Sequence, residues 1–183
     1  MNWLLFLPQL PASPSTLRVT VWRRMRAAGA FGLQNGVWVL PSVPENKQFI
    51  ENQMIYIREQ GAGSYVFDVV SINPSVEESI LAGFRVQRDE EYTEFCERCD
   101  ALLAELEKET AGEKFTFAEL EEAETDVHKL ETWLGKITAR DFVGGNQRQS
   151  ALDKLERCRE AYQEFAVKVY AQQGIDPTGS AEE

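Results

Sequence analysis

Short apolar runs alternate with amphipathic segments through residues 1–72. The runs are rich in aromatic and β-branched side chains, which favour strands, and they predict strands at 3–7, 30–33, 37–40 and 64–70. Between them, apolar residues recur at helical spacing and predict helices at about 15–28 and 44–60. The order strand, helix, strand, strand, helix, strand indicates a ferredoxin-like α+β domain with one four-stranded antiparallel sheet.

Proline, serine, asparagine and glycine residues mark the ends of these elements. The turn at 8–14 contains three prolines, which exclude a continuing helix or central strand. We expect Ser13 to cap the first helix, with Pro14 at its first position and Gly29 as its left-handed end. Asn35-Gly36 lies between two apolar runs, and such a pair strongly predicts a hairpin.

From residue 73 onward the apolar pattern is helical, with helices expected at 73–85, 89–110, 116 to the glycines at 144–145, and 147–172. The last three predict an antiparallel bundle. We therefore expect a ferredoxin-like domain at 1–72, a helical bundle at 73–174 and a flexible tail at 175–183. Both helices of the first domain lie on one sheet face, so the later helices or a second subunit must cover the other. A homodimer is thus one expected partner.

The bundle also predicts where the cysteines lie. Counted from the expected turns at about 1.5 Å per residue, Cys99, Val127 and Cys158 fall at similar heights. We expect Cys99 and Cys158 to be buried, reduced thiols in one core layer. Cys96 and Cys99 form a Cys-x-x-Cys, but it lies inside a helix, and the one histidine, His128, is expected to be exposed. No metal is therefore predicted.

Charge is distributed unevenly along the chain. The net charge is −11, yet residues 1–44 contain four arginines and no carboxylate, so the remaining 15 basic and 30 acidic residues give −15. The apolar runs are shorter than the roughly 18–20 residues that a membrane helix requires, and no secretory leader is recognisable. We therefore expect a cytoplasmic protein without a membrane partner.

All four arginines lie on the first predicted helix: Arg18, Arg23, Arg24 and Arg26. At about 100° per residue, Arg23 and Arg26 point away from the sheet, while Arg18 and Arg24 lie on the flanks. Arginine suits phosphate because its planar, permanently charged group makes bidentate contacts. The helix therefore predicts contact with a DNA backbone or another oxyanion, or else ion pairs with the acidic bundle.

The runs WLLFLPQLPASPSTLRVTVWRRMRAAGA and LQNGVWVLP resemble the amino-terminal domain of the bacterial chromate-resistance regulators of the ChrB family. The similarity continues more loosely in KLETWLGKITARDF and FAVKVYA, and so covers nearly the whole chain. Members of that family commonly carry a second, carboxy-terminal domain of similar size. The resemblance implies a regulator that binds the promoter of its own operon, with Arg18, Arg23, Arg24 and Arg26 as DNA contacts and chromate as a candidate effector.

Two other classes of function remain to be compared. The fold pattern is distantly similar to the CRISPR spacer-acquisition proteins, some of which are metal-dependent nucleases. That chemistry requires a carboxylate near the end of the first strand, but Leu7, Pro8 and Gln9 lie there and the first acidic residue is Glu45. No phosphate loop, dinucleotide fingerprint or nucleophile elbow occurs, so we expect neither an enzyme nor a cofactor. The main alternative to DNA binding is an interaction module whose arginines bind an acidic partner or the bundle, or a direct chromate sensor.

Overall fold

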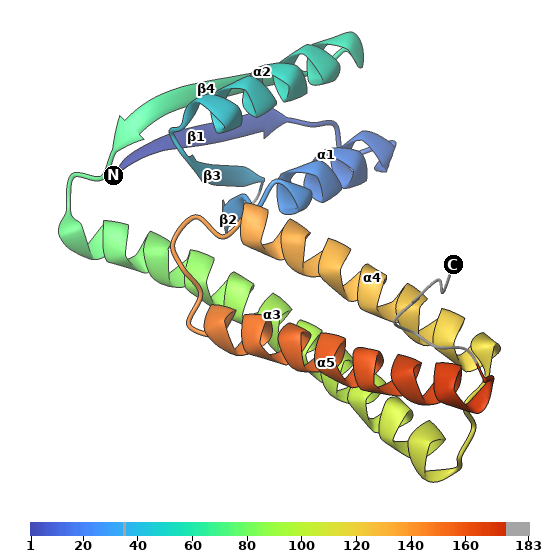
Figure 1. Cartoon of the computed structure of the whole chain (residues 1–183). Helices are drawn as coiled ribbons and strands as arrows, with labels where there is room; N and C mark the ends of the chain where they lie inside the picture. The colour runs from blue at the N-terminus through green and yellow to red at the C-terminus, as the bar shows by residue number, and fades with distance from the viewer. Residues whose placement is uncertain (35, 175–183) are drawn as a thin grey trace, which may run out of the picture. The chain divides into compact units, whose positions relative to one another are not determined.

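A computed structural model describes residues 1–34 and 36–174 of the chain (Figure 1). Its elements are β1 (Asn2–Gln9), α1 (Thr16–Ala27), β2 (Phe31–Gln34), β3 (Val37–Pro41), α2 (Pro44–Glu59), β4 (Gly63–Val70), α3 (Pro74–Ala111), α4 (Phe117–Ala139) and α5 (Arg148–Gln172). The chain forms two compact units, one of residues 1–86 with 140–143, the other of 87–139 with the chain from 144 onward. The predicted tail and the hairpin residue Asn35 lie outside the described residues. Within the described ranges, no helix combines the length and apolar character that a membrane crossing requires.

The first unit contains a four-stranded sheet with the strand order β2-β3-β1-β4, and every neighbouring pair is antiparallel. This confirms the predicted α+β class, the single antiparallel sheet and the βαββαβ order of elements. The strands β2 and β3 pair as the hairpin that Asn35-Gly36 predicts. Gly36 has a φ of +84°, a conformation that glycine adopts without strain.

The strand β1 continues past its predicted end at Leu7 and includes Pro8, so the turn expected from that residue begins later. A proline lacks the N–H that a central strand donates to its neighbours. The pairing of β1 with β3 ends at Phe6↔Trp38, whereas its pairing with β4 continues to Gln9↔Gly63. Pro8 therefore has a neighbouring strand on one side alone, as in an edge strand.

Both α1 and α2 pack on one face of the sheet, as predicted. Alternate residues of a strand point to the same face, and the even-numbered apolar residues of β1 and β3 point toward these helices. The resulting core contains Leu4, Phe6, Trp38 and Leu40 from the sheet with Val21, Met25, Ile50 and Ile57 from the helices. Burial of this apolar surface holds the helices on the sheet.

The opposite face is covered in part by the first turns of α3 and by residues 140–143. The ring of Phe84 stacks on Trp3 with 5.7 Å between centroids and meets Phe142 edge-on at 6.3 Å. This confirms the predicted cover by the later helices for this part of the sheet. Two aromatic side chains of β4 on the same face remain exposed.

The helix α3 is one continuous helix of 38 residues, so the predicted break between residues 85 and 89 is wrong. Residues 84–92 contain neither glycine nor proline, and most of them favour a helix. Asp89, at which a new helix was expected, instead accepts hydrogen bonds from the Gln147 N–H at 3.1 Å and the Asn146 amide at 2.9 Å. This carboxylate therefore accepts a hydrogen bond from the backbone N–H of Gln147, the residue that precedes α5.

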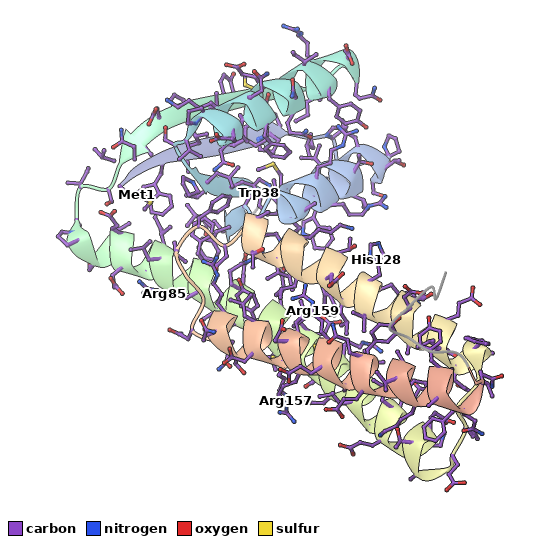
Figure 2. All side chains as sticks on the ribbon, viewed as in Figure 1. Met1, Trp38, Arg85, His128, Arg157 and Arg159 are labelled. Carbon is purple, nitrogen blue, oxygen red and sulfur yellow. The ribbon has the colours of Figure 1, made fainter. Side chains whose placement is uncertain are left out.

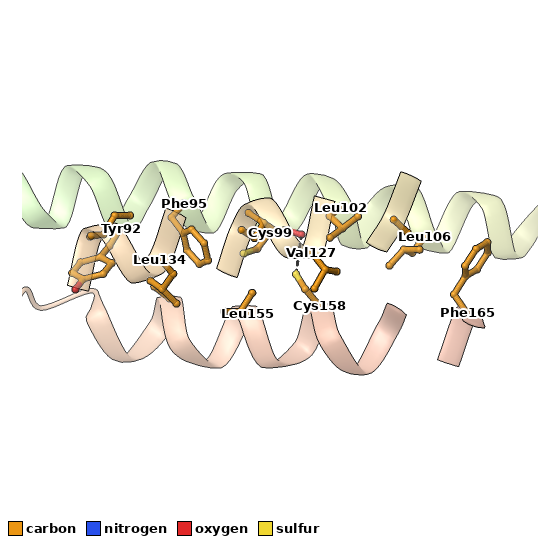
Figure 3. Close-up of a cluster of buried hydrophobic side chains, with 14 of the residues drawn as sticks. Tyr92, Phe95, Cys99, Leu102, Leu106, Val127, Leu134, Leu155, Cys158 and Phe165 are labelled. Atoms are coloured by element: carbon orange, nitrogen blue, oxygen red, sulfur yellow. Dashed lines mark hydrogen bonds between the residues drawn. The ribbon is translucent and has the colours of Figure 1, made fainter. Parts of the chain in front are cut away.

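The second unit has its core between α3, α4 and α5 (Figure 3). Thr116 caps α4 as predicted, because its hydroxyl accepts the Glu119 N–H at 3.3 Å. The buried face of α4 is the predicted apolar stripe, Leu120, Ala123, Val127, Leu130, Leu134 and Ile137. These residues account for the predicted antiparallel packing of amphipathic helices.

Cys99 and Cys158 are completely buried, and the Cys158 thiol donates to the Cys99 carbonyl at 3.6 Å. Val127 lies beside them, so the predicted layer of three residues is confirmed (Figure 3). The hydrogen bond with Cys158 and burial raise the pKa of Cys99 far above its ordinary value. A raised pKa disfavours the thiolate form, which reactive cysteines need.

Candidate nucleic-acid interface

The helix α1 carries the four predicted arginines, and its beginning differs from the expectation. The predicted cap at Ser13, with Pro14 as the first helical residue, is wrong because the helix begins at Thr16. Ser15 precedes it without a side-chain capping bond. A capping residue normally has an extended backbone, and Ser15 has helical angles (φ −72°, ψ −10°), which keep its hydroxyl from the first turn.

The end of α1 is fixed by Gly29, as predicted. Gly29 has a φ of +78°, and the N–H groups of Gly29 and Ala30 donate to the carbonyls of Arg26 and Met25, each at 3.0 Å. This pair of bonds is the Schellman motif. A β-carbon at Gly29 would lie 2.7 Å from that of Arg140, so the position requires glycine for space as well as for conformation.

The four arginines differ in exposure. Val21 and Met25 are buried toward the sheet, which places Arg23 on the outer face of α1, where it is exposed. Arg18 is also exposed, whereas Arg24 is half-buried. The prediction that Arg26 is exposed is wrong; it is half-buried, because it lies in the last turn, beside the covered end of the helix.

Arg18 lies at an open pocket of about 450 Å³. The other lining residues are Pro8, Leu10, Val21, Trp22, Gly36 and Trp38 (Trp38 is labelled in Figure 2). The Arg18 guanidinium donates to the Pro11 carbonyl at 3.1 Å, which orients it. Among the described residues that line the pocket, Arg18 alone is charged, and Trp22 is 53% exposed. The pocket therefore offers a cation beside an aromatic surface.

Arg24 is held by a different contact. Its guanidinium lies over the ring of Tyr56 on α2, 3.8 Å from the ring centroid. A cation over an aromatic face is attracted by the ring quadrupole, and the stacked guanidinium keeps its outward N–H groups. Tyr56 thus reduces the conformational freedom of Arg24 without neutralising its charge.

Within the described part of the first unit, none of the four arginines forms an ion pair with a carboxylate. Asp68 of the same unit pairs with Lys47 at 2.8 Å and accepts a hydrogen bond from Ser42 at 2.8 Å. The bond from Lys47, followed by that from Ser42, lowers the pKa of Asp68. Within this unit, the positive charges of α1 are thus not neutralised by an ion pair.

The sequence identified the arginines but not Tyr56 and Trp38, which lie beside Arg24 and at the pocket of Arg18. Tyr56 and Trp38 lie far from α1 along the chain, and no spacing rule connects them with Arg24 or Arg18. Trp22 is the exception, because it follows Arg18 by one helical turn and this spacing alone indicates that the two side chains are neighbours.

His128 projects from α4, and its side chain is 80% exposed, as predicted (Figure 2). It is thus separated from the buried thiols Cys99 and Cys158, which are free. Across residues 1–34 and 36–174 the structure contains no cluster of three or more histidine, cysteine, aspartate or glutamate side chains suited to a metal ion.

Comparison with known proteins relates this chain to one family. Residues 18–175 match the family model described as "Protein ChrB, N-terminal". A curated relative, "Protein ChrB" of Cupriavidus metallidurans (strain ATCC 43123 / DSM 2839 / NBRC 102507 / CH34), is 24% identical over 154 residues, which are 84% of this chain and 47% of the relative. The chain thus spans about half the length of the curated relative that it matches.

Proposed function

Because the chain belongs to the family of ChrB amino-terminal domains, which links it to chromate resistance, we propose that it is a DNA-binding regulator whose α1 arginines contact phosphates. Its target is the promoter of its own operon in the cytoplasm, and chromate is the effector. The role is one of binding, without catalysis.

One observation supports DNA binding above the others: α1 presents a cluster of guanidinium groups in a carboxylate-free stretch of an otherwise acidic chain. Phosphate contacts supply most of the sequence-independent affinity for DNA, and their strength depends on local charge. Salt screens charges beyond about 8–10 Å, so only a carboxylate closer than this to the arginines would weaken their attraction for a phosphate.

The arginines have separate tasks in this proposal. Arg23 is exposed and reaches a phosphate freely, whereas Arg24 is oriented in advance by Tyr56 and so loses less entropy on binding. Arg18 lines the same pocket as Trp22. In this proposal it binds at the edge of the protein–DNA interface, where a sugar or base contacts the Trp22 ring.

The first prediction concerns Arg23→Ala in a gel shift with the upstream region of its own gene. Loss of one phosphate contact lowers affinity for all sequences and reduces the salt slope by about 0.9. Arg157→Ala is the matched control, since Arg157 is an exposed arginine on α5 and its loss changes the charge equally. Equal affinity of wild type and Arg23→Ala would instead favour the interaction-module alternative.

The same gel shift, repeated with chromate, tests the effector. Release of DNA by chromate at constant ionic strength would support sensing by this chain. Sulfate is the control oxyanion and should not release the DNA. If DNA binds but chromate does not release it, chromate is sensed outside this chain.

A further inference from the structure

The strand β4 forms one edge of the sheet. All eight of its residues pair with β1, from Asn2↔Val70 to Gln9↔Gly63. Among the described residues, no other strand lies beside it, so its outer row of backbone N–H and C=O groups has no strand partner. An unpaired row of this kind is a template for a further strand.

The side chains of β4 make this edge unusual. Tyr65 is 55% exposed and Phe67 is 52% exposed, and both lie on the sheet face opposite α1 and α2. Proteins usually protect an edge strand with free charges, proline or a bulge. The edge has one charged residue, Asp68, which is bound to Lys47 and Ser42.

From this edge we infer that two copies of the chain associate by antiparallel pairing of β4 with β4, which continues the sheet from one copy into the other. The occupant is a second copy because the strand matches itself. A two-fold axis perpendicular to the sheet keeps each side chain on its own face. Residues that lie opposite one another share a face, so one residue of β4 must lie opposite the same residue of the second copy, and the axis passes between these two. We name each register by that residue.

Two registers use seven residues of each strand, with the axis at Val66 or at Phe67. An axis at Phe67 places the Asp68 carboxylate opposite the apolar Val66 of the second copy. An axis at Val66 places Tyr65 opposite Phe67, and Ser64 opposite Asp68. Aromatic pairs stabilise antiparallel strands, and a hydroxyl donates to a carboxylate. The register at Val66 is therefore preferred.

This register covers the exposed aromatic side chains. Each copy contributes Tyr65 and Phe67, so four rings gather around the axis on one face of a continuous sheet. The inference is independent of DNA binding, because association is measured without nucleic acid.

The test measures molar mass by light scattering over a range of concentrations, using the full chain of 20.8 kDa. The wild type is expected to approach twice this mass as concentration rises. Tyr65→Lys with Phe67→Lys places lysines opposite one another and should remain monomeric. Leu152→Lys with Val167→Lys, which changes two exposed apolar residues of α5 by the same charge, should associate as the wild type does.

Cross-linking tests the register. Tyr65→Cys and Phe67→Cys proteins are oxidised separately and as a mixture, with the wild type as background for the three native cysteines. Residues 65 and 67 lie opposite one another in the inferred register, so the mixture should give the greater yield of covalent dimer. Equal yields would overturn the register. A monomeric wild type, or an associated Tyr65→Lys/Phe67→Lys protein with native circular dichroism, would overturn the interface.

Discussion

At the scale of single residues, chemically identical side chains have different surroundings. Arg23 extends freely, Arg24 lies on Tyr56, and Arg18 is hydrogen-bonded to a carbonyl at a pocket. Affinity for an anion depends on charge and on the entropy lost when the side chain is fixed. Arg24 should therefore contribute more per contact than its half-buried position suggests.

The cysteines give a second prediction at this scale. Replacing Cys99 or Cys158 by alanine removes a buried sulfur atom from a tightly packed layer and should lower the free energy of unfolding by about 1 kcal/mol each. Cys96→Ala, at a half-buried position, is the control and should cost less. Urea unfolding measures all three variants. An equal cost at Cys96, or stoichiometric zinc in the purified protein, would contradict the assignment of a simple apolar layer.

Features of single residues were predictable where they depend on neighbours along the chain, and not where they depend on contacts between distant segments. The burial of Cys99 and Cys158 was predictable, because helical periodicity and regular rise determine height and face. The contact of Arg24 with Tyr56 was not, because it depends on how two helices meet on the sheet. The exposure of Arg26 was misjudged: it lies in the turn before Gly29, and Arg140 and Phe142 approach that glycine from a distant part of the chain.

At the scale of elements, Asp89 links two helices of the second unit. It lies within α3, yet its carboxylate accepts from Gln147 and Asn146 at the beginning of α5. Helix N-termini have unpaired N–H groups and a partial positive charge, both of which a carboxylate satisfies. Asp89 therefore has a partner in α5 and does not need to begin a new helix, which agrees with the continuous α3.

A third prediction follows from Asp89→Ala. Loss of the cap should lower stability by about 1 kcal/mol and increase hydrogen exchange in the first turn of α5. Glu90→Ala, at the exposed neighbouring position, removes the same charge and should leave exchange unchanged. Unchanged protection of residues near 148 in Asp89→Ala would show that packing alone holds that turn.

Elements were predictable where local chemistry decided them. Asn35-Gly36 between apolar runs predicts a hairpin and Gly29 predicts a helix end, and the structure has both, with a positive φ at Gly36 and at Gly29. The predicted break in α3 was wrong, because residues 84–92 favour a helix. Asp89, where a new helix was predicted to begin, accepts hydrogen bonds from Asn146 and Gln147 instead. Pro8 was misjudged because its strand loses a neighbour there, which only pairing reveals.

At the scale of the whole molecule, ionised carboxylates are held by specific cations. Lys47 and Ser42 lower the pKa of Asp68, and Lys114, more than Lys108, lowers that of Glu109, relative to ordinary values of 3.8 and 4.5. A carboxyl group whose pKa is lowered in the folded protein contributes to stability at any pH above its ordinary pKa. That contribution is lost as pH falls through the lowered pKa.

The fourth prediction is therefore an acid-sensitive stability. The thermal midpoint should be nearly constant at neutral pH and fall as pH decreases to about 3. Glu109→Gln should lower the midpoint at neutral pH and flatten its fall in acid, whereas Glu107→Gln, an exposed neighbour, should behave as the wild type does. A wild-type slope in Glu109→Gln would assign the acid sensitivity to other groups.

Residues 140–143 belong to the first unit although the helices on either side of them belong to the second. Phe142 packs against Phe84, so the chain returns to complete a core that it left near residue 86. Neither unit is a contiguous piece of the gene. A contiguous segment that contains one whole unit therefore also contains part of the other. Fragments that end before residue 140 should behave as damaged first units rather than as independent domains.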